Sequence, residues 1–139
     1  MPTPDGILEA ALYAPDLDAA ATFYGDILGL TEVGRVSGRH VFYRVGAAIL
    51  LIFRADATRD GAPPGAALPV PGHGAEGPGH VCFMMEARAL DQLKQGLAAR
   101  GVPVEADFRW PNGARSVYLR DPAGNSVEFA EPRLWVDPA

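Results

Sequence analysis

The same order of strand-like and helix-like segments occurs twice along this chain. In each half, a short apolar segment precedes a helical pattern that ends at a glycine, Gly29 or Gly101, and three extended segments follow. Repeated units usually pack against each other, so we expect two β-α-β-β-β modules whose sheets surround a shared concavity. The expected strands are 7–13, 31–36, 39–45, 47–53, 80–85, 104–108, 115–119 and 126–130, and the expected helices are 17–28 and 89–100.

The chain length limits the number of domains. A chain of 139 residues can bury a real core but has no room for a second independent domain. We therefore expect a single domain over 1–139, with module one at about 5–54, a linker at 55–79 and module two at about 80–134. The linker is rich in Gly, Pro and Ala and shows no periodicity. It is either a lid or crossing segment over a site, or a connector with no role.

Charge and cysteine content exclude several classes of function. The net charge is −5, and the twelve Lys and Arg residues are scattered, which argues against nucleic-acid binding. Neither a membrane-spanning run nor a signal-peptide pattern is present, so a soluble cytoplasmic protein is expected. The single cysteine, Cys82, rules out an intrachain disulfide and a cysteine-based zinc site. Its apolar neighbours predict an inert core residue rather than a reactive thiol.

One isolated carboxylate stands out in the last predicted hairpin. The turn at 121–124 contains Pro and Gly in positions that favour a tight reversal, and residues rich in β-formers flank it on both sides. Because side chains alternate along a strand, Glu128 points to the face opposite Val127 and Phe129. It is therefore either a solvated residue or a carboxylate buried for a purpose.

Several short motifs occur together in a fixed order: APDLD at 14–18, FY at 23–24, LGL at 28–30, GHV at 79–81, and DPAGN at 121–125 followed by Glu128. In this order the chain resembles the glyoxalase/bleomycin-resistance/extradiol-dioxygenase family, the vicinal oxygen chelate superfamily. The resemblance covers nearly the whole chain. It implies an α+β fold in which two βαβββ modules form a half-open, curved mixed β-barrel with helices outside, usually in a homodimer.

The resemblance also implies a metal site. Family members bind a divalent metal through residues on the first and last strands of the modules, and here Glu9, His80 and Glu128 fill those places. A fourth place matches Leu50 by its offset from Gly46 and cannot ligate, and Glu9 stands where a histidine is frequent. One imidazole with two carboxylates would suit Mn, Fe, Zn, Ni, Co or Mg without strong selection. The alternative is that these residues line a pocket and no metal binds.

Further residues on the same strands and turns are candidates for substrate contact. His40 and His73 are weaker candidates for a site role. Arg115 faces either inward, where it would fit a carboxylate or phosphate, or outward as surface charge. Trp135 is expected to pack on the outside or across a dimer contact. The predicted substrate-binding residues are Arg39, Tyr43, Phe53, Met84, Trp110, Arg115 and Tyr118.

The resemblance and the candidate site residues are compatible with two main functions. The first is a metal-dependent enzyme, of lyase/isomerase or dioxygenase type, acting on a small oxygenated organic molecule, with Glu128 or Glu9 moving a proton. The second is a metal-free protein of the bleomycin-resistance type that sequesters a small molecule, with both carboxylates salt-bridged to arginines. A third alternative is a structural dimer with a filled barrel. The sequence leaves the substrate, the metal, the reaction and the pairing of modules within or between chains open.

Overall fold

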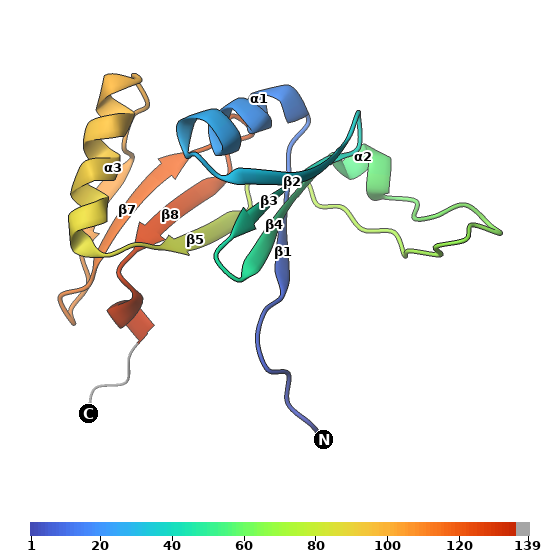
Figure 1. Ribbon diagram of the computed structural model, residues 1–139, viewed down its shortest axis with the longest axis horizontal. Coiled ribbons are helices and arrows are strands. Elements are labelled where there is room, and N and C mark those ends of the chain that lie inside the picture. Colours follow the sequence, from blue (N-terminus) through green and yellow to red (C-terminus); the bar gives the residue numbers. More distant parts are fainter. Residues whose placement is uncertain (136–139) are drawn as a thin grey trace. The chain divides into compact units, whose positions relative to one another are not determined.

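The computed structural model describes residues 1–135 and divides into two compact units, Met1–Gly77 and Pro78–Ala139. Figure 1 shows that each unit contains its own sheet with a helix packed on it. Each sheet has two free edge strands, so neither closes into a barrel by itself. Within residues 1–135, no helix has the length and apolar character required to span a bilayer.

Unit 1 follows the predicted order of strand, helix and three strands. Its elements are β1 (Glu9–Tyr13), α1 (Leu17–Ala21), η1 (Thr22–Ile27), β2 (Thr31–Val36), β3 (His40–Val45), β4 (Ala48–Phe53) and α2 (Ala55–Thr58). The sheet order is β1-β4-β3-β2, with β1 parallel to β4 and the other neighbours antiparallel.

Unit 2 repeats this topology. Its elements are β5 (His80–Met84), α3 (Ala87–Ala99), β6 (Ala106–Arg109), β7 (Arg115–Arg120), β8 (Ser126–Ala130) and the short 3₁₀ turn η2 (Pro132–Trp135). The sheet order is β5-β8-β7-β6, again with one parallel pair, β5 with β8. The predicted α+β class and its two βαβββ modules are therefore confirmed, whereas the union of both modules in a single domain stays a prediction.

In each unit one sheet face packs against the helices. In unit 1 the fully buried side chains of Val41, Tyr43 and Ile52 face α1 and η1, and the rings of Tyr24 and Tyr43 lie 6.2 Å apart. In unit 2, α3 covers β7 and β8 with its buried Leu90. These two faces form the cores of the units. The opposite face of each sheet is left for other contacts.

The helix predicted at 17–28 is interrupted. It begins as expected at Asp16, whose carboxylate accepts a hydrogen bond from the Ala19 amide at 3.0 Å. From Thr22 it widens into a π-helical turn, in which the Leu28 amide donates to the Phe23 carbonyl at 2.9 Å. Gly25 lies in this turn directly against the Tyr43 ring.

The linker predicted between the modules has more structure than its composition indicates. It starts with α2, a helix too short to give a periodic signal, and then folds back on itself. The Thr58 hydroxyl donates to the His73 carbonyl at 2.6 Å, and the His73 amide donates to the Thr58 carbonyl at 3.0 Å. The two sides of the loop are closely packed here. A Cβ on Gly72 would overlap the carbonyl oxygen of Arg59 and would lie 2.9 Å from the amide nitrogen of Gly61. We call residues 59–72 the return loop.

Candidate functional site

Glu128 lies at the centre of the open face of the unit 2 sheet. The strand register pairs it with Cys82 of β5 on one side and with Tyr118 of β7 on the other. Directly paired residues present their side chains on the same face, so these three residues form one row. Val127 and Phe129 point to the α3 side, as the alternation in the sequence predicted. Glu128 is buried, with 5% of its surface exposed.

His80 directly contacts this carboxylate. Its Nε2 lies 3.2 Å from Oε1 of Glu128, and its Nδ1 lies 3.0 Å from the carbonyl oxygen of Ser126. A carbonyl only accepts hydrogen bonds, so Nδ1 carries the hydrogen. The lone pair or proton on Nε2 is then directed at a carboxylate oxygen. Two such atoms facing each other require either a shared proton or a cation between them.

The second oxygen of Glu128 is held by a directional chain of hydrogen bonds. The Trp110 indole Nε1 donates to Oγ of Ser116 at 2.7 Å, and the Ser116 hydroxyl is 2.6 Å from Oε2 of Glu128. An indole can only donate, so the Ser116 hydroxyl is free to donate its own hydrogen to the carboxylate. Ser116 is fully buried. This series of hydrogen bonds therefore fixes the position of the Glu128 carboxylate.

The charge of Glu128 affects its neighbours in the row. Burial and the nearby Glu128 carboxylate raise the pKa of the Tyr118 phenol to about 12. Partial burial and the same carboxylate raise the pKa of the Cys82 thiol to about 12. Both groups are therefore protonated at neutral pH. Cys82 is exposed on the open face and is not the core residue that its apolar neighbours predicted, because strand alternation turns it away from α3.

Aromatic rings extend the open face of unit 2. Phe108 stacks on Tyr118 with ring centroids 5.7 Å apart, and it contacts the edge of Trp110 at 4.9 Å. The ring of His80 stacks on the other side of Tyr118 at 6.2 Å. Met84 is on the same face and is largely exposed. Among these residues, Phe108 was not predicted as a site residue. The sequence places it on a strand, but only the pairing with Ser116 of β7 shows that its ring lies on the open face.

The structure does not bring Arg115 to the open face. Its guanidinium lies on the α3 side, where Nε is 2.9 Å from Asp107 and Nη1 is 2.6 Å from Asp91. Hydrogen bonds from Arg115 and Lys94 hold the pKa of Asp107 well below its usual range. Of the two orientations considered for Arg115, the one toward the Glu128 face is not found, and the residue instead ties α3 to β6.

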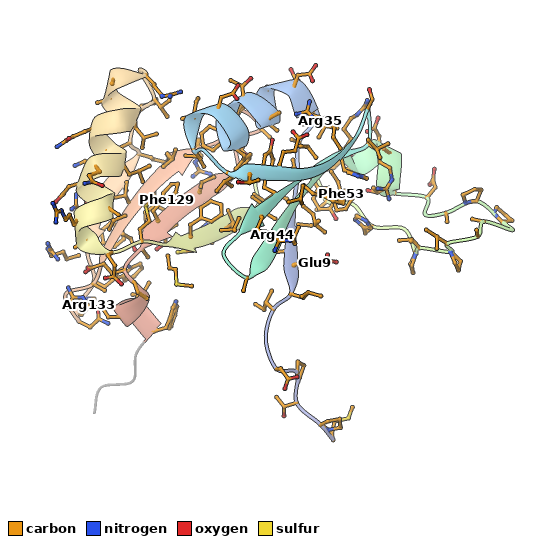
Figure 2. All side chains as sticks on the ribbon, in the orientation of Figure 1. Glu9, Arg35, Arg44, Phe53, Phe129 and Arg133 are labelled. Atoms are coloured by element: carbon orange, nitrogen blue, oxygen red, sulfur yellow. The ribbon has the colours of Figure 1, made fainter. Side chains whose placement is uncertain are left out.

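The open face of the unit 1 sheet carries Glu9 and a pocket of about 630 Å³. Glu9 opens β1 and is exposed, and Phe53 closes β4 at the other end of this face (Figure 2). The return loop passes over part of the pocket. The residues that line it are Glu9, Ala10, Ala11, Tyr13, Arg39, Phe42, Leu51, Phe53, Val70, Pro71, Gly72 and His73.

One end of this pocket is aromatic and polar. Nδ1 of His73 is 2.8 Å from the hydroxyl of Tyr13, and the His73 ring meets the edge of Phe53 with centroids 4.6 Å apart. His73 was a weak candidate because it lies in the linker. The residue reaches the sheet because the two hydrogen bonds with Thr58 turn the chain back at that point.

Arg39 lies at the same end. Its guanidinium sits over the Phe53 ring at 5.5 Å from the centroid, and its Nη1 donates to Nδ1 of His40 at 2.5 Å. Burial and the Arg39 cation lower the pKa of His40. His40 is therefore neutral at neutral pH, and its ring stacks on Phe42 at 3.9 Å.

Two expectations for module one are corrected by its strand register. Tyr43, predicted to contact substrate, pairs with Leu50 and faces Tyr24 on the helix side, where it is 1% exposed. Leu50 is likewise on the helix side. In module two, Glu128 belongs to the third residue pair between the first and last strands, Cys82 with Glu128. The third pair in module one is Ala11 with Leu51, so Leu51 on the open face is the residue equivalent to Glu128. A shift of one residue along a strand changes the face, and the offset from Gly46 did not detect it. Leu51 cannot ligate a metal either.

Glu9 and His80 occupy equivalent places, because each opens the first strand of its module and pairs with the first half of the last strand. The structure brings His80 and Glu128 together within unit 2, whereas Glu9 belongs to unit 1. Among residues 1–135, no group of three His, Cys, Asp or Glu side chains lies close enough to hold a metal ion. Convergence of all three predicted ligands stays a prediction.

Comparison with known proteins now identifies the fold. The model of the glyoxalase/bleomycin resistance protein/dioxygenase superfamily matches residues 6–129. The chain belongs to this superfamily. A search of curated proteins gave no significant match.

Solved structures of the superfamily share this fold. A lactoylglutathione lyase from Agrobacterium tumefaciens is 45% identical, with a TM-score of 0.88, over 98% of this chain and 100% of that chain. A glyoxalase/bleomycin resistance protein/dioxygenase from Nocardioides is 22% identical, with a TM-score of 0.72, over 100% of this chain and 91% of that chain. A glyoxalase family protein from Bacillus anthracis is 21% identical, with a TM-score of 0.70, over 94% and 98%. The last two similarities concern the superfamily fold alone.

Proposed function

We propose that this superfamily member is a divalent-metal-dependent enzyme, of lyase or isomerase type, that acts on a small oxygenated organic molecule. The supporting observation is the contact of His80 with Glu128. Nδ1 of His80 is satisfied by the Ser126 carbonyl, and Nε2 lies 3.2 Å from Oε1 of a buried carboxylate. A carbonyl that accepts a hydrogen bond from one ring nitrogen, with the other nitrogen directed at a carboxylate, is an arrangement typical of metal-ligating histidines.

The donor set fits a divalent ion. His80 Nε2 and Glu128 Oε1 would supply two ligands, and Glu9, at the position equivalent to His80, would supply a third from the same chain or from a partner copy. One imidazole and two carboxylates suit Mn²⁺, Fe²⁺, Zn²⁺, Ni²⁺, Co²⁺ or Mg²⁺. When bound, the ion would act as a Lewis acid that polarises a carbonyl group of the substrate.

The remaining chemistry belongs to the side chains of the open face. The Glu128 carboxylate, held by Ser116, would accept a proton from the carbon next to that carbonyl and return it to a neighbouring atom. The Tyr118 phenol keeps its proton at neutral pH and would donate a hydrogen bond to a substrate oxygen in the same row. The rings of Phe108 and Trp110 would limit the access of water on one side.

The similarity to the lactoylglutathione lyase suggests the first substrate to test. The purified protein would be stripped of metal, reloaded with each divalent ion in turn, and assayed for the formation of lactoylglutathione from glutathione and the corresponding α-ketoaldehyde, through the gain of thioester absorbance. We expect bound metal in near-stoichiometric amount, a higher melting temperature on reloading, and turnover by the loaded protein.

Variants connect these results to the site. Glu128→Gln and His80→Ala should lose the metal and its thermal shift, whereas Glu105→Gln should keep both, since Glu105 is an exposed carboxylate of unit 2 that pairs with Arg120. If the wild-type protein takes up none of these ions and its melting temperature does not respond to them, the proposal of a metal enzyme fails. If it binds metal but does not form lactoylglutathione, the metal site stands and the substrate is another oxygenated molecule.

A metal-free sequestering protein is the second candidate. Two observations favour it: Leu51 occupies the position equivalent to Glu128 in module one, and the unit 1 pocket is lined largely by apolar and aromatic residues. The expected salt bridges from Glu9 and Glu128 to arginines are not found within residues 1–135, where the ion-pair partner of Glu128 is His80. A protein that binds small molecules equally well with and without metal, and catalyses no reaction, would favour this candidate.

A further inference from the structure

The unit 1 pocket has opposite character at its two ends. Glu9 lies at one end of β1 and Tyr13 at the other, roughly 13 Å away along an extended strand. Tyr13 pairs with Phe53, and Phe53 pairs with His40, so Arg39 also belongs to the Tyr13 end. One end therefore carries a carboxylate and the other a guanidinium.

The guanidinium of Arg39 is available to a ligand. Among the ion pairs within residues 1–135, none joins Arg39 to a carboxylate, although most other arginines have such a partner. Its side-chain contacts are a hydrogen bond to neutral His40 and the face of Phe53. These contacts orient the guanidinium but leave its charge without a counter-ion. A half-buried cation in this state is a typical anion-binding group.

The middle of the pocket is apolar. The rings of Phe42 and Phe53 are in edge contact, with centroids 5.4 Å apart, and Leu51 continues the same face. Val70 and Pro71 of the return loop also line the pocket. An apolar lining of this kind is suited to an aromatic or aliphatic body with few polar groups.

We propose that this pocket binds a small carboxylic acid with an apolar or aromatic body, with Arg39 holding the carboxylate at the Tyr13 end. In the metal-free protein, the Glu9 carboxylate repels a second anionic group at the opposite end and so sets the direction of the ligand. The Tyr13 and His73 pair supplies a further hydrogen bond beside Arg39. The inference rests on the proposed function only in treating this ligand as the substrate, and it assigns to Arg39 the anion recognition that the sequence left open for Arg115.

The test uses two matched probes, 3-phenylpropanoate and its neutral amide, with the metal-stripped full-length protein. Binding is followed by ¹H–¹⁵N NMR, and dissociation constants come from the titration. We expect the carboxylate to bind at least about ten-fold more tightly than the amide, the size of effect given by one charge-assisted hydrogen bond. The amide signals that move should belong to β1, β4 and the return loop.

Three variants make the result specific to Arg39. Arg39→Gln should lose the preference for the carboxylate, and Arg39→Lys should keep part of it, because the charge remains while the planar fork is lost. Arg44→Gln is the matched control: Arg44 has the same charge, lies on β3, which begins directly after Arg39, and does not line the pocket, so the preference should be unchanged (Figure 2).

The outcomes separate this inference from the proposed function. Equal binding of acid and amide, no detectable binding of the acid, or an unchanged preference in a folded Arg39→Gln protein would overturn the inference. Glu128→Gln should bind 3-phenylpropanoate like the wild type even though it loses metal. Failure of metal binding with intact probe binding would therefore refute the enzyme proposal and leave the acid site in place.

Discussion

Ser116 and Glu128 face each other on adjacent strands, with Oγ of Ser116 at 2.6 Å from Oε2 of Glu128 and both residues buried. The hydroxyl also accepts the Trp110 indole hydrogen, so its own hydrogen points toward the carboxylate. A carboxylate that is fixed on one oxygen and faces a histidine with the other is prepared to bind a cation or a proton. Several expected outcomes follow from this arrangement and from the packing around it.

Replacing Ser116 with alanine should destabilise the protein and loosen the site. The substitution leaves a buried carboxylate oxygen and the Trp110 indole without their partner, which typically costs about 1–3 kcal/mol. Urea unfolding would measure the loss of free energy, and metal titration would measure a weaker affinity. Ser126→Ala is the control, because its carbonyl still binds His80. Equal stability of the two variants would contradict the hydrogen-bond chain.

The pKa of Tyr118 should depend on Glu128. Free tyrosine titrates near pH 10, whereas burial and the Glu128 carboxylate raise the pKa of Tyr118 to about 12. Because the folded-state pKa is the higher one, its contribution to stability is complete below about pH 10 and is lost as the pH rises toward 12. Ultraviolet titration of tyrosinate should show this late transition. Burial also raises the pKa of Tyr43, so Tyr118→Phe should lower the amplitude of this transition by one tyrosine. The Tyr118 part should shift to lower pH in Glu128→Gln, but not in Glu105→Gln.

Asp107 should make the stability of the protein sensitive to acid. Arg115 and Lys94 lower the folded-state pKa of its carboxyl group, so the stabilising effect is complete above the unfolded value of about 4 and is lost as the pH falls below it. Asp107→Asn should reduce the unfolding free energy by up to about 1 kcal/mol at neutral pH, the size expected for an ion pair that solvent partly screens. The difference from wild type should shrink in acid. Urea unfolding at a series of pH values measures it, and a difference that is constant with pH would contradict this account.

Gly72→Ala should disturb the return loop. A Cβ at this position would overlap the Arg59 carbonyl oxygen, and overpacking of this kind costs about 1–3 kcal/mol. Loss of stability and a shift in the NMR signals of His73 are the expected results. Gly96→Ala is an informative contrast: it lies within α3 with nothing within 4 Å of a new Cβ, so it should raise stability by about 1 kcal/mol. Similar effects of the two substitutions would contradict the close packing of the loop.

Much of the fold was predictable because both modules contain the same signals for the ends of helices and strands. The helical segments end two residues before Gly29 and Gly101, both of which have positive φ, and the predicted strand bounds lie within a few residues of the observed ones. Which face of a strand a side chain occupies was harder, since this depends on register. Glu128 was placed correctly because its hairpin turn is unambiguous. Leu50 was placed on the wrong face because the turn at Gly46 is shorter than the turn at 121–124.

The candidate site was only partly accessible to sequence reasoning. His80 and Glu128 carry a recognisable pattern, and the structure brings them together. Trp110 was predicted as a substrate contact but its indole holds Ser116, a connection that depends on how a turn folds back on its own strand. His73 and Tyr13 are far apart in the sequence, and no local pattern links them. Arg115 and Arg39 are chemically alike, and only their ion-pair partners distinguish them.

The paired hydrogen bonds between Thr58 and His73 have a consequence for how this chain tolerates change. They tie the return loop at its base, so that His73 is anchored independently of the residues at the tip. Residues 62–69 can therefore gain, lose or exchange amino acids while the imidazole keeps its place beside Tyr13. Natural variants or an inserted reporter peptide at the tip would alter the outer surface of the return loop and leave the hydrogen bond between His73 and Tyr13 intact.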